Sequence, residues 1–356
     1  MHCIACRSEK NLRVAHVSKG WWCKTLFSLR SLAPSLTRIT IAGAVGAALH
    51  VGQGDPNLID AKAIMFSRAV LDQTEVDGEV ISCEGPKDNA PAFMRREKVG
   101  TRKGPKVEFV IDPVDGSTAA SKGRKDAISA IACAPAGCFQ VFPDDGYYFK
   151  VATGHHSVGK ISLDMSVEEI VRTVAKEKGL PLENFTVIML ERERHQEILK
   201  KIRKLGVRII LIPDGDIAAA VVASIPSSGV DLLIGAGAGP EATIAATAVK
   251  CLRGAMLVKV WRDEKDDPGR LSRLMAEGVD VNKTYDEDEL AEGNELVFAA
   301  SGVTKGELLD GVRFVLDGAN VSSICMRLPS GTMEKSDTTL RFKGHPVYQQ
   351  FLRSLL

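Results

Sequence analysis

The stretch "VEFVIDPVDGSTAASKG", Val107 to Gly123, places two aspartates three residues apart after an apolar run, with a serine two residues further on. The run "KVEFVID" alternates and then becomes fully apolar, which is typical of a strand entering a core. We predict that this strand ends at Asp112, because Pro113 cannot donate a hydrogen bond to a sheet ladder. Proline fixes one backbone angle and Gly116 permits a tight reversal, so Asp112 and Asp115 can converge on one site.

Composition bounds the kind of protein and its partners. The chain has 356 residues, 45% apolar and 26% charged, as in globular proteins. Its net charge of +1 gives no electrostatic reason to expect binding to nucleic acid or a membrane surface. The run "ITIAGAVGAALHVG" at 39–52 is shorter than the roughly 20 residues of a membrane span, and we predict a core helix there. A small molecule is the expected partner.

The first residues differ from the rest. Residues 1–34 hold six Lys or Arg and one acid, Glu9, a composition similar to an organelle transit segment. A disordered extension is the alternative. We therefore set residues 1–37 apart as a basic leader and expect a cytoplasmic or plastid location. The eight cysteines are too sparse for a disulfide scaffold, which indicates a reducing compartment. A lone CxxC is weak evidence for zinc, although four side chains could form such a site: Cys3, Cys6, His16 and Cys23.

Helical and strand patterns alternate along the remainder. Ser166 and Glu169 form a capping-box signature that opens a predicted helix at 167–179. Further helices are predicted at 35–52, 60–73, 193–206, 217–225 and 242–254. Strands are predicted at 78–85, 126–137, 185–190, 207–213 and 230–235, with a glycine-rich turn at 236–241. This alternation predicts a layered α/β architecture with ligands at loops that follow strands. We expect a metal-binding half over 38–160 and a substrate-binding half over 161–356.

Acidic residues gather in the predicted Gly/Pro loops. Such carboxylates suit a hard divalent cation, Mg²⁺ or Mn²⁺. Taken singly, each of these acids could instead cap a helix or occupy a turn. The set comprises Asp55, Asp60, Glu84, Asp88, Asp112, Asp115, Asp214, Asp216 and Glu241.

The pattern Asp-Pro-hydrophobic-Asp-Gly-Ser is the signature of the metal-dependent, lithium-sensitive sugar phosphatases. Over residues 38–345 the chain resembles class II fructose-1,6-bisphosphatase. The matching blocks include "GQGDPNLID", "CEGPKDNAP", "LGVRIILIPDGDIAAA", "GAGAGPEATIAA" and "SGVTKGELLDGVRF". The resemblance implies a layered αβαβα sugar phosphatase fold. It also implies hydrolysis of the 1-phosphate of fructose 1,6-bisphosphate, in gluconeogenesis or the Calvin cycle, and allows sedoheptulose 1,7-bisphosphate as a substrate. We expect a homo-oligomer, either a dimer or a tetramer.

The resemblance also implies roles for single residues. Two metals are implied, one held by Asp60 and Glu84 and the other by Asp112, Asp115 and Glu241. Ser117, where the family has threonine, would orient or deprotonate the attacking water together with Asp88. Substrate contacts are implied for Asp115, Gly116, Ser117, Tyr147 or its neighbour Tyr148, Arg192, Arg194, Asp214, Gly215, Asp216 and Ala238.

The sequence departs from the family pattern at several positions. Pro56 and Pro86 replace a lysine and an acid, Lys62 places an ammonium near Asp60, and Ala238 replaces a glycine. These changes leave every implied carboxylate ligand in place, but they could reduce activity. Two alternatives therefore stay open. One is an inositol-monophosphate-type phosphatase, and the other is a paralogue that binds sugar phosphates without turnover.

Overall fold

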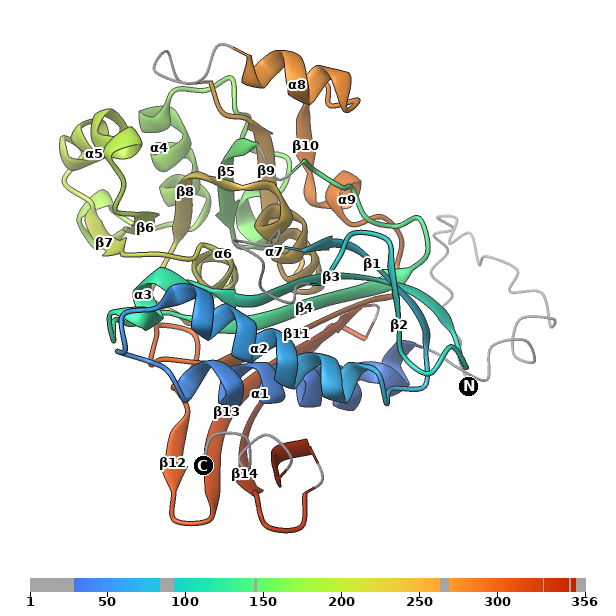
Figure 1. The fold of residues 1–356 in the computed structure, drawn as a ribbon. Coiled ribbons are helices and arrows are strands. Elements are labelled where there is room, and N and C mark those ends of the chain that lie inside the picture. Colours follow the sequence, from blue (N-terminus) through green and yellow to red (C-terminus); the bar gives the residue numbers. More distant parts are fainter. Residues whose placement is uncertain are drawn as a thin grey trace, which may run out of the picture.

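The computed structural model describes residues 29–83, 93–143, 146–262, 269–328, 330–345 and 347–349. These residues build two β-sheets with helices on and between them (Figure 1). The larger sheet has eight strands in the order β12-β13-β11-β4-β3-β1-β2, with β14 also paired to β13. Its strands are β1 Asp77–Cys83, β2 Glu97–Val99, β3 Lys106–Asp115, β4 Ile128–Pro135, β11 Leu296–Gly302, β12 Arg313–Val315, β13 Gly318–Leu328 and β14 Thr332–Arg341.

The smaller sheet has six strands in the order β10-β9-β5-β8-β6-β7. Strand β6 runs parallel to β7 and β8, whereas β5 is antiparallel to both β8 and β9. The strands are β5 Tyr147–Thr153, β6 Thr186–Leu190, β7 Arg208–Ile212, β8 Leu232–Ala238, β9 Ala255–Val260 and β10 Thr284–Asp286.

Nine α-helices are described, besides short 3-10 turns at Leu29–Leu32, His155–Ser157, Leu182–Asn184 and Glu193–His195. The α-helices are α1 Ala33–Ala48, α2 Pro56–Leu71, α3 Ser117–Ser121, α4 Val167–Glu177, α5 Gln196–Arg203, α6 Ile217–Ser224, α7 Gly239–Cys251, α8 Arg270–Ala276 and α9 Glu287–Leu290. Among the described residues, no helix has both the length and the apolar character needed to cross a membrane.

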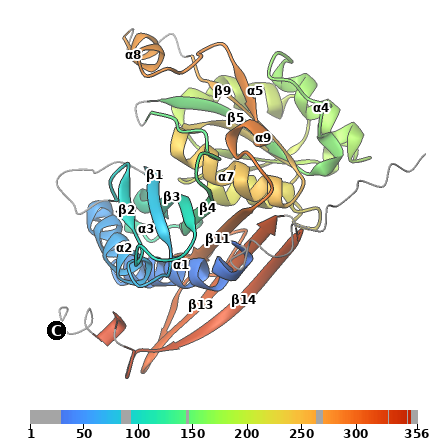
Figure 2. The same ribbon diagram turned by 90° about the vertical axis from the view of Figure 1, so that its right-hand side faces the viewer.

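Helices form three layers that alternate with the two sheets, two on the outer faces and one between the sheets. Helices α1 and α2 cover the outer face of the larger sheet, and α4 and α5 cover the outer face of the smaller one (Figures 1 and 2). Helices α6 and α7 lie between the sheets, where their side chains join one apolar core with strands of both. Their sequences explain this position: every residue of "IAAAVVAS" in α6 is buried, and a helix that is apolar all round belongs in an interior. The predicted layered αβαβα fold is confirmed.

Several predicted elements are confirmed at their boundaries. Helix α4 begins after Ser166, whose hydroxyl accepts from the Glu169 N–H at 3.2 Å, while the Glu169 carboxylate accepts from the Ser166 N–H at 2.7 Å.

The final residues of the predicted leader, 29–37, are part of the fold, since Leu29, Leu32 and Leu36 are buried in the core of the larger sheet. The predicted zinc ligands lie outside the described residues. The larger sheet takes strands from both 38–160 and 161–356. The assignment of metal binding to the first range and substrate binding to the second stays a prediction.

Three predicted boundaries were wrong. The strand predicted to end at Asp112 continues as β3 to Asp115, because its register to β4 shifts between these two aspartates and Pro113 falls in that irregularity. The predicted turn at 236–241 is divided between a strand and a helix, as β8 runs to Ala238 and α7 begins at Gly239. The break predicted over 52–60 ends early: Pro56 is the first residue of α2, a position that does not need its missing N–H.

Candidate active site

Three carboxylates converge where the end of β3 lies against the first turns of α6 and α7. Asp112 and Asp115 lie at the end of β3, and Glu241 lies in the first turn of α7. Each offers an oxygen, and these oxygens lie within 4.8 Å of one another. Both aspartates are 1% exposed. The cluster joins residues far apart in the chain, and its all-oxygen donor set suits a hard divalent cation.

Asp115 shows why a cation fits this cluster. Its Oδ2 accepts a hydrogen bond from the Ile217 N–H at 2.9 Å, at the start of α6. Its Oδ1 is buried and has no hydrogen-bond partner among the described residues. Leaving a buried carboxylate oxygen unpaired costs free energy, and such exceptions usually mark a missing ion or water. The residues present therefore fit a divalent cation between Asp112, Asp115 and Glu241.

Two glycines allow the backbone to approach these carboxylates. Gly215 has φ +73°, and a Cβ there would lie 2.8 Å from Asp115 Oδ1. A Cβ at Gly237 would lie 2.1 Å from Asp216 Oδ2 and 3.0 Å from Glu241 Oε2. The glycines of "PDGD" and "GAGAG" are thus required by close packing around the acids.

The sequence analysis missed one charged residue of this site, the buried Lys150. Alternation along β5 puts Lys150 on the same face as Tyr148 and Ala152, which point into the core shared with α6 and α7. Lys150 is 1% exposed, and its Nζ donates to both oxygens of Asp216 at 2.8 Å and to Glu241 Oε2 at 3.1 Å. The available signal was a lysine inside the strand-like run "YYFKVAT", where a buried charge demands partners.

Burial and charge shift the protonation of this group. Burial raises the pKa of Asp115 well above its ordinary value, and the charges of Glu241 and Asp216 raise it further. Burial also raises the pKa of Asp216 to about 7, although the Lys150 ammonium acts in the opposite direction. Burial acts to raise the pKa of Glu241, but the Lys150 charge and the hydrogen bonds to Glu241 together outweigh burial and lower the pKa. Burial disfavours the charged form of Lys150, but Asp216 and Glu241 together outweigh it and raise the lysine's pKa.

The predicted arginines lie near β8 and the end of β7. Arg192 donates to the Pro213 carbonyl and forms an ion pair with Asp214. Arg194 donates to the Ala236 carbonyl through Nη2 at 2.6 Å, and its guanidinium lies 4.6 Å from the centre of the Tyr147 ring. Both arginines are therefore tied to the backbone beside the site.

The two tyrosines differ in their surroundings. Tyr147 is 43% exposed and pairs with Ala238 across the sheet, so it stands beside Arg194 at the surface. Tyr148 is fully buried, with its ring 4.3 Å from that of Phe142. A ligand from solvent can reach Tyr147 but not Tyr148.

Gly116 and Ser117 follow the metal-capable aspartates directly. Gly116 has φ +96°, the left-handed conformation that glycine adopts without strain, and it precedes α3. Ser117 is the first residue of α3 and is buried, 5% exposed, two positions after Asp115. Ser117 therefore lies on the chain segment that directly follows the two aspartates.

Of the two ligands predicted for the other metal, Asp60 is among the described residues and Glu84 is not. Asp60 lies within α2 and not in a loop, and it is not part of the metal-capable group found among the described residues. Glu84 and Asp88 lie outside the described residues. Asp55 caps α2, accepting from the Leu58 N–H at 3.1 Å, as the helix-cap alternative expected.

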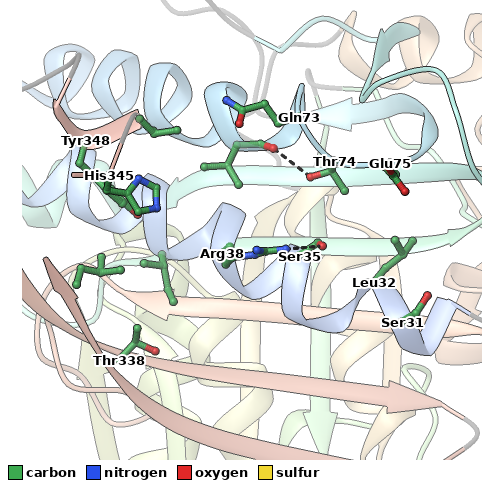
Figure 3. A pocket seen from close by; sticks show the side chains of 14 residues that line it. Ser31, Leu32, Ser35, Arg38, Gln73, Thr74, Glu75, Thr338, His345 and Tyr348 are labelled. Atoms are coloured by element: carbon green, nitrogen blue, oxygen red, sulfur yellow. Dashed lines mark hydrogen bonds between the residues drawn. The ribbon is translucent and has the colours of Figure 1, made fainter. Parts of the chain in front are cut away.

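A separate cavity of about 630 Å³ lies over the outer face of α1. Figure 3 shows Ser35 and Arg38 of α1, Thr338 of β14 and His345 among the residues that line it. Arg38 donates to the Ser35 hydroxyl at 3.1 Å. None of the predicted site residues that the structure describes lines this cavity.

Comparison with known proteins agrees with this geometry. The sequence model described as bacterial fructose-1,6-bisphosphatase, glpX-encoded, matches residues 30–340. A protein of Escherichia coli (strain K12) named fructose-1,6-bisphosphatase 1 class 2 is 33% identical over 316 residues, which cover 86% of this chain and 94% of that relative. Proteins named fructose-1,6-bisphosphatase class 2 from Escherichia coli O6:H1 (strain CFT073) and Shigella flexneri show the same identity and coverage.

The αβαβα layers and the carboxylate cluster between them define an α/β phosphatase. More specifically, the chain belongs to the bacterial, class II fructose-1,6-bisphosphatase family. The family match begins at residue 30, close to the first described residue, Leu29.

Proposed function

We propose that this protein hydrolyses the 1-phosphate of fructose 1,6-bisphosphate with the help of Mg²⁺ or Mn²⁺. Family membership supports the reaction, since the similar proteins are named for it. The observation that carries the metal is the buried, unpartnered Oδ1 of Asp115 within the carboxylate cluster. Asp112, Asp115 and Glu241 would hold one cation, and Asp60 and Glu84 are proposed for a second.

In the proposed reaction, water attacks phosphorus and the bond from phosphorus to the C1 oxygen of the sugar breaks. The products are inorganic phosphate and fructose 6-phosphate. When bound, the divalent cations supply positive charge that offsets the charge of the phosphoryl group. Ser117, with Asp88, would orient the attacking water, and Asp115, Gly116 and Ser117 would line the phosphate.

The second phosphate needs cations from the protein itself. We assign this role to Arg192 and Arg194, because guanidinium groups fork onto phosphate oxygens. Arg192 is already paired with Asp214, so a bound phosphate would compete with that carboxylate. Asp214, Gly215, Asp216, Ala238 and Tyr147 are proposed to contact the sugar. Tyr147 supports this assignment because its exposed ring packs beside Arg194.

Several finer points belong to the same proposal. Sedoheptulose 1,7-bisphosphate is a second candidate substrate, and a dimer or tetramer is the proposed assembly. We propose a cytoplasmic location, one of the two that the sequence suggested. The alternative without turnover was motivated by Pro86, which lies outside the described residues, and by Lys62 near Asp60. Lys62 and Asp60 are two apart on α2, and helix positions two apart do not face each other.

Phosphate release from a panel of substrates tests the proposal. Fructose 1,6-bisphosphate, sedoheptulose 1,7-bisphosphate and inositol monophosphate are each incubated with Mg²⁺, Mn²⁺ or EDTA. We expect release from the sugar bisphosphates that requires a divalent cation. Activity on the monophosphate alone would select the inositol-type alternative, and no release from any substrate would select the binding paralogue. Full activity in EDTA would refute the metal site.

A further inference from the structure

We propose that Lys150 is a positioning residue of the divalent cation site, and that it holds Glu241 in the orientation that binds the cation. This inference rests on the proposed function, because it concerns the same carboxylate cluster. Lys150 lies on β5, a strand that provides none of the three converging carboxylates.

The hydrogen bonds of Glu241 define its orientation. Its Oε2 accepts from Lys150 Nζ at 3.1 Å and from the Ala238 N–H at 3.1 Å. Two donors therefore occupy one carboxylate oxygen, and the other oxygen is left for a cation shared with Asp112 and Asp115. Without the ammonium, Glu241 would keep one of these two bonds and could rotate away.

The position of the ammonium is fixed by the fold. Lys150 pairs with Gly235 of β8 on one side and Val258 of β9 on the other, so its backbone lies in the middle of the smaller sheet. Its Nζ is clamped by both oxygens of Asp216 at 2.8 Å. A Cβ on Gly237 would lie 2.9 Å from this Nζ, so the glycine leaves space for the ammonium and the carboxylates together. The lysine has little freedom to move.

Electrostatics alone would predict the opposite effect of Lys150 on metal binding. A lone ammonium repels a divalent cation, so its removal should tighten binding if Coulomb repulsion dominated. Four carboxylates surround the site, namely Asp112, Asp115, Asp216 and Glu241, and Lys150 alone cannot neutralise them. The proposal holds that orientation of Glu241 outweighs this repulsion. The sign of the change in cation affinity therefore decides between the two effects.

The test compares two lysines, each paired with a buried aspartate, in the full-length protein. Mn²⁺ binding is measured by isothermal titration calorimetry for wild type, Lys150→Met and the matched control Lys178→Met. Lys178 forms an ion pair with the buried Asp231 at 2.5 Å, but it touches none of the clustered carboxylates. We expect Lys150→Met to raise the Kd for Mn²⁺ by about 10- to 100-fold, the usual effect of losing a group that orients a metal ligand. Lys178→Met should bind Mn²⁺ like wild type.

Unchanged or tighter Mn²⁺ binding in Lys150→Met would overturn the proposal, as would equal weakening in Lys178→Met. If Lys150→Met does not fold, Lys150→Gln replaces it, because its shorter, neutral side chain does not hold both carboxylates. The same weakening is expected there, and wild-type affinity would again refute the role. Mn²⁺ binding needs no sugar. A wild-type protein that binds Mn²⁺ but hydrolyses no sugar bisphosphate would therefore fail the proposed function and leave this inference standing.

Discussion

Lys150 in the smaller sheet and Lys178 near it each pair with a buried aspartate, but in different ways. Lys178 follows α4 and pairs with Asp231, whose other oxygen accepts from the Thr186 N–H at 2.8 Å. One cation thus meets one anion, and both carboxylate oxygens have partners. Lys150 instead meets two carboxylates, with Asp112 and Asp115 close to Glu241. The balanced region, Lys178 with Asp231, contributes to stability. The unbalanced region, Lys150 with Asp216, Glu241, Asp112 and Asp115, has more acids than bases and can bind a further positive charge.

The largest effect should follow removal of a carboxylate from the unbalanced region. Asp112→Asn or Glu241→Gln keeps the volume but removes a ligand charge, and we expect turnover to fall at least about 10³-fold, since a catalytic cation is worth several kcal/mol. The measurement is kcat for fructose 1,6-bisphosphate at saturating Mn²⁺. Asp231→Asn is the control from the balanced region and should keep its kcat. Activity within a few-fold of wild type in either site variant would contradict the metal assignment.

Ser117 tests the chemistry next to that cluster. Ser117→Ala should lower kcat about 10²-fold with little change in KM, because an interaction that orients the attacking water matters mainly in the transition state. Ser117→Thr should retain or raise kcat, since it restores the residue typical of the family and its methyl group restricts the rotamer. Steady-state kinetics of both variants give the answer. If alanine leaves kcat unchanged, Ser117 is a turn residue only.

The balanced region should respond in stability and not in activity. Lys178→Met strands the buried Asp231 carboxylate, and we expect a loss of about 3 kcal/mol in the free energy of unfolding. Urea denaturation followed by circular dichroism measures it. The control is Lys200→Met, which breaks an exposed pair with Glu197 and should cost at most about 1 kcal/mol. Equal losses in the two variants would remove the distinction between buried and exposed pairs.

The smallest effect concerns pH and the protein without metal. The pKa values of Asp115 and Asp216 are raised, that of Asp216 to about 7. An acid with a raised pKa holds its proton more tightly when folded, so its stabilising effect is lost as pH rises toward that pKa. The melting temperature in EDTA should therefore fall between about pH 5 and pH 7, relative to Asp216→Asn.

The same comparison with Mn²⁺ tests its cause. A bound cation favours the ionised carboxylates, so Mn²⁺ should remove the decline in melting temperature. A decline of equal size in wild type and Asp216→Asn would assign the pH dependence to other groups. A melting temperature that ignores Mn²⁺ at pH 7 would count against the cluster as a cation site.

Much of the fold could be read from local sequence. The alternation of strands and helices predicted the layered architecture, because side-chain periodicity reflects which face is buried. The capping box at Ser166 predicted the start of α4, since its hydrogen bonds join residues three apart. Boundaries failed where a residue type has two uses. Pro113 and Pro56 were taken as breaks, yet one lies in a strand irregularity and the other opens a helix.

The sequence by itself determined that Asp112, Asp115 and Ser117 lie together, because they share one short segment of the chain. The resemblance added Glu241 to them. Only the tertiary structure showed that Lys150 contacts Asp216 and Glu241, since it lies 66 residues from the first and 91 from the second. A lysine in a sequence is expected at the surface, and no local pattern shows that a strand carries it into the core. Sheet pairing and the packing of α6 and α7 bring these charges together, because such contacts depend on the whole fold.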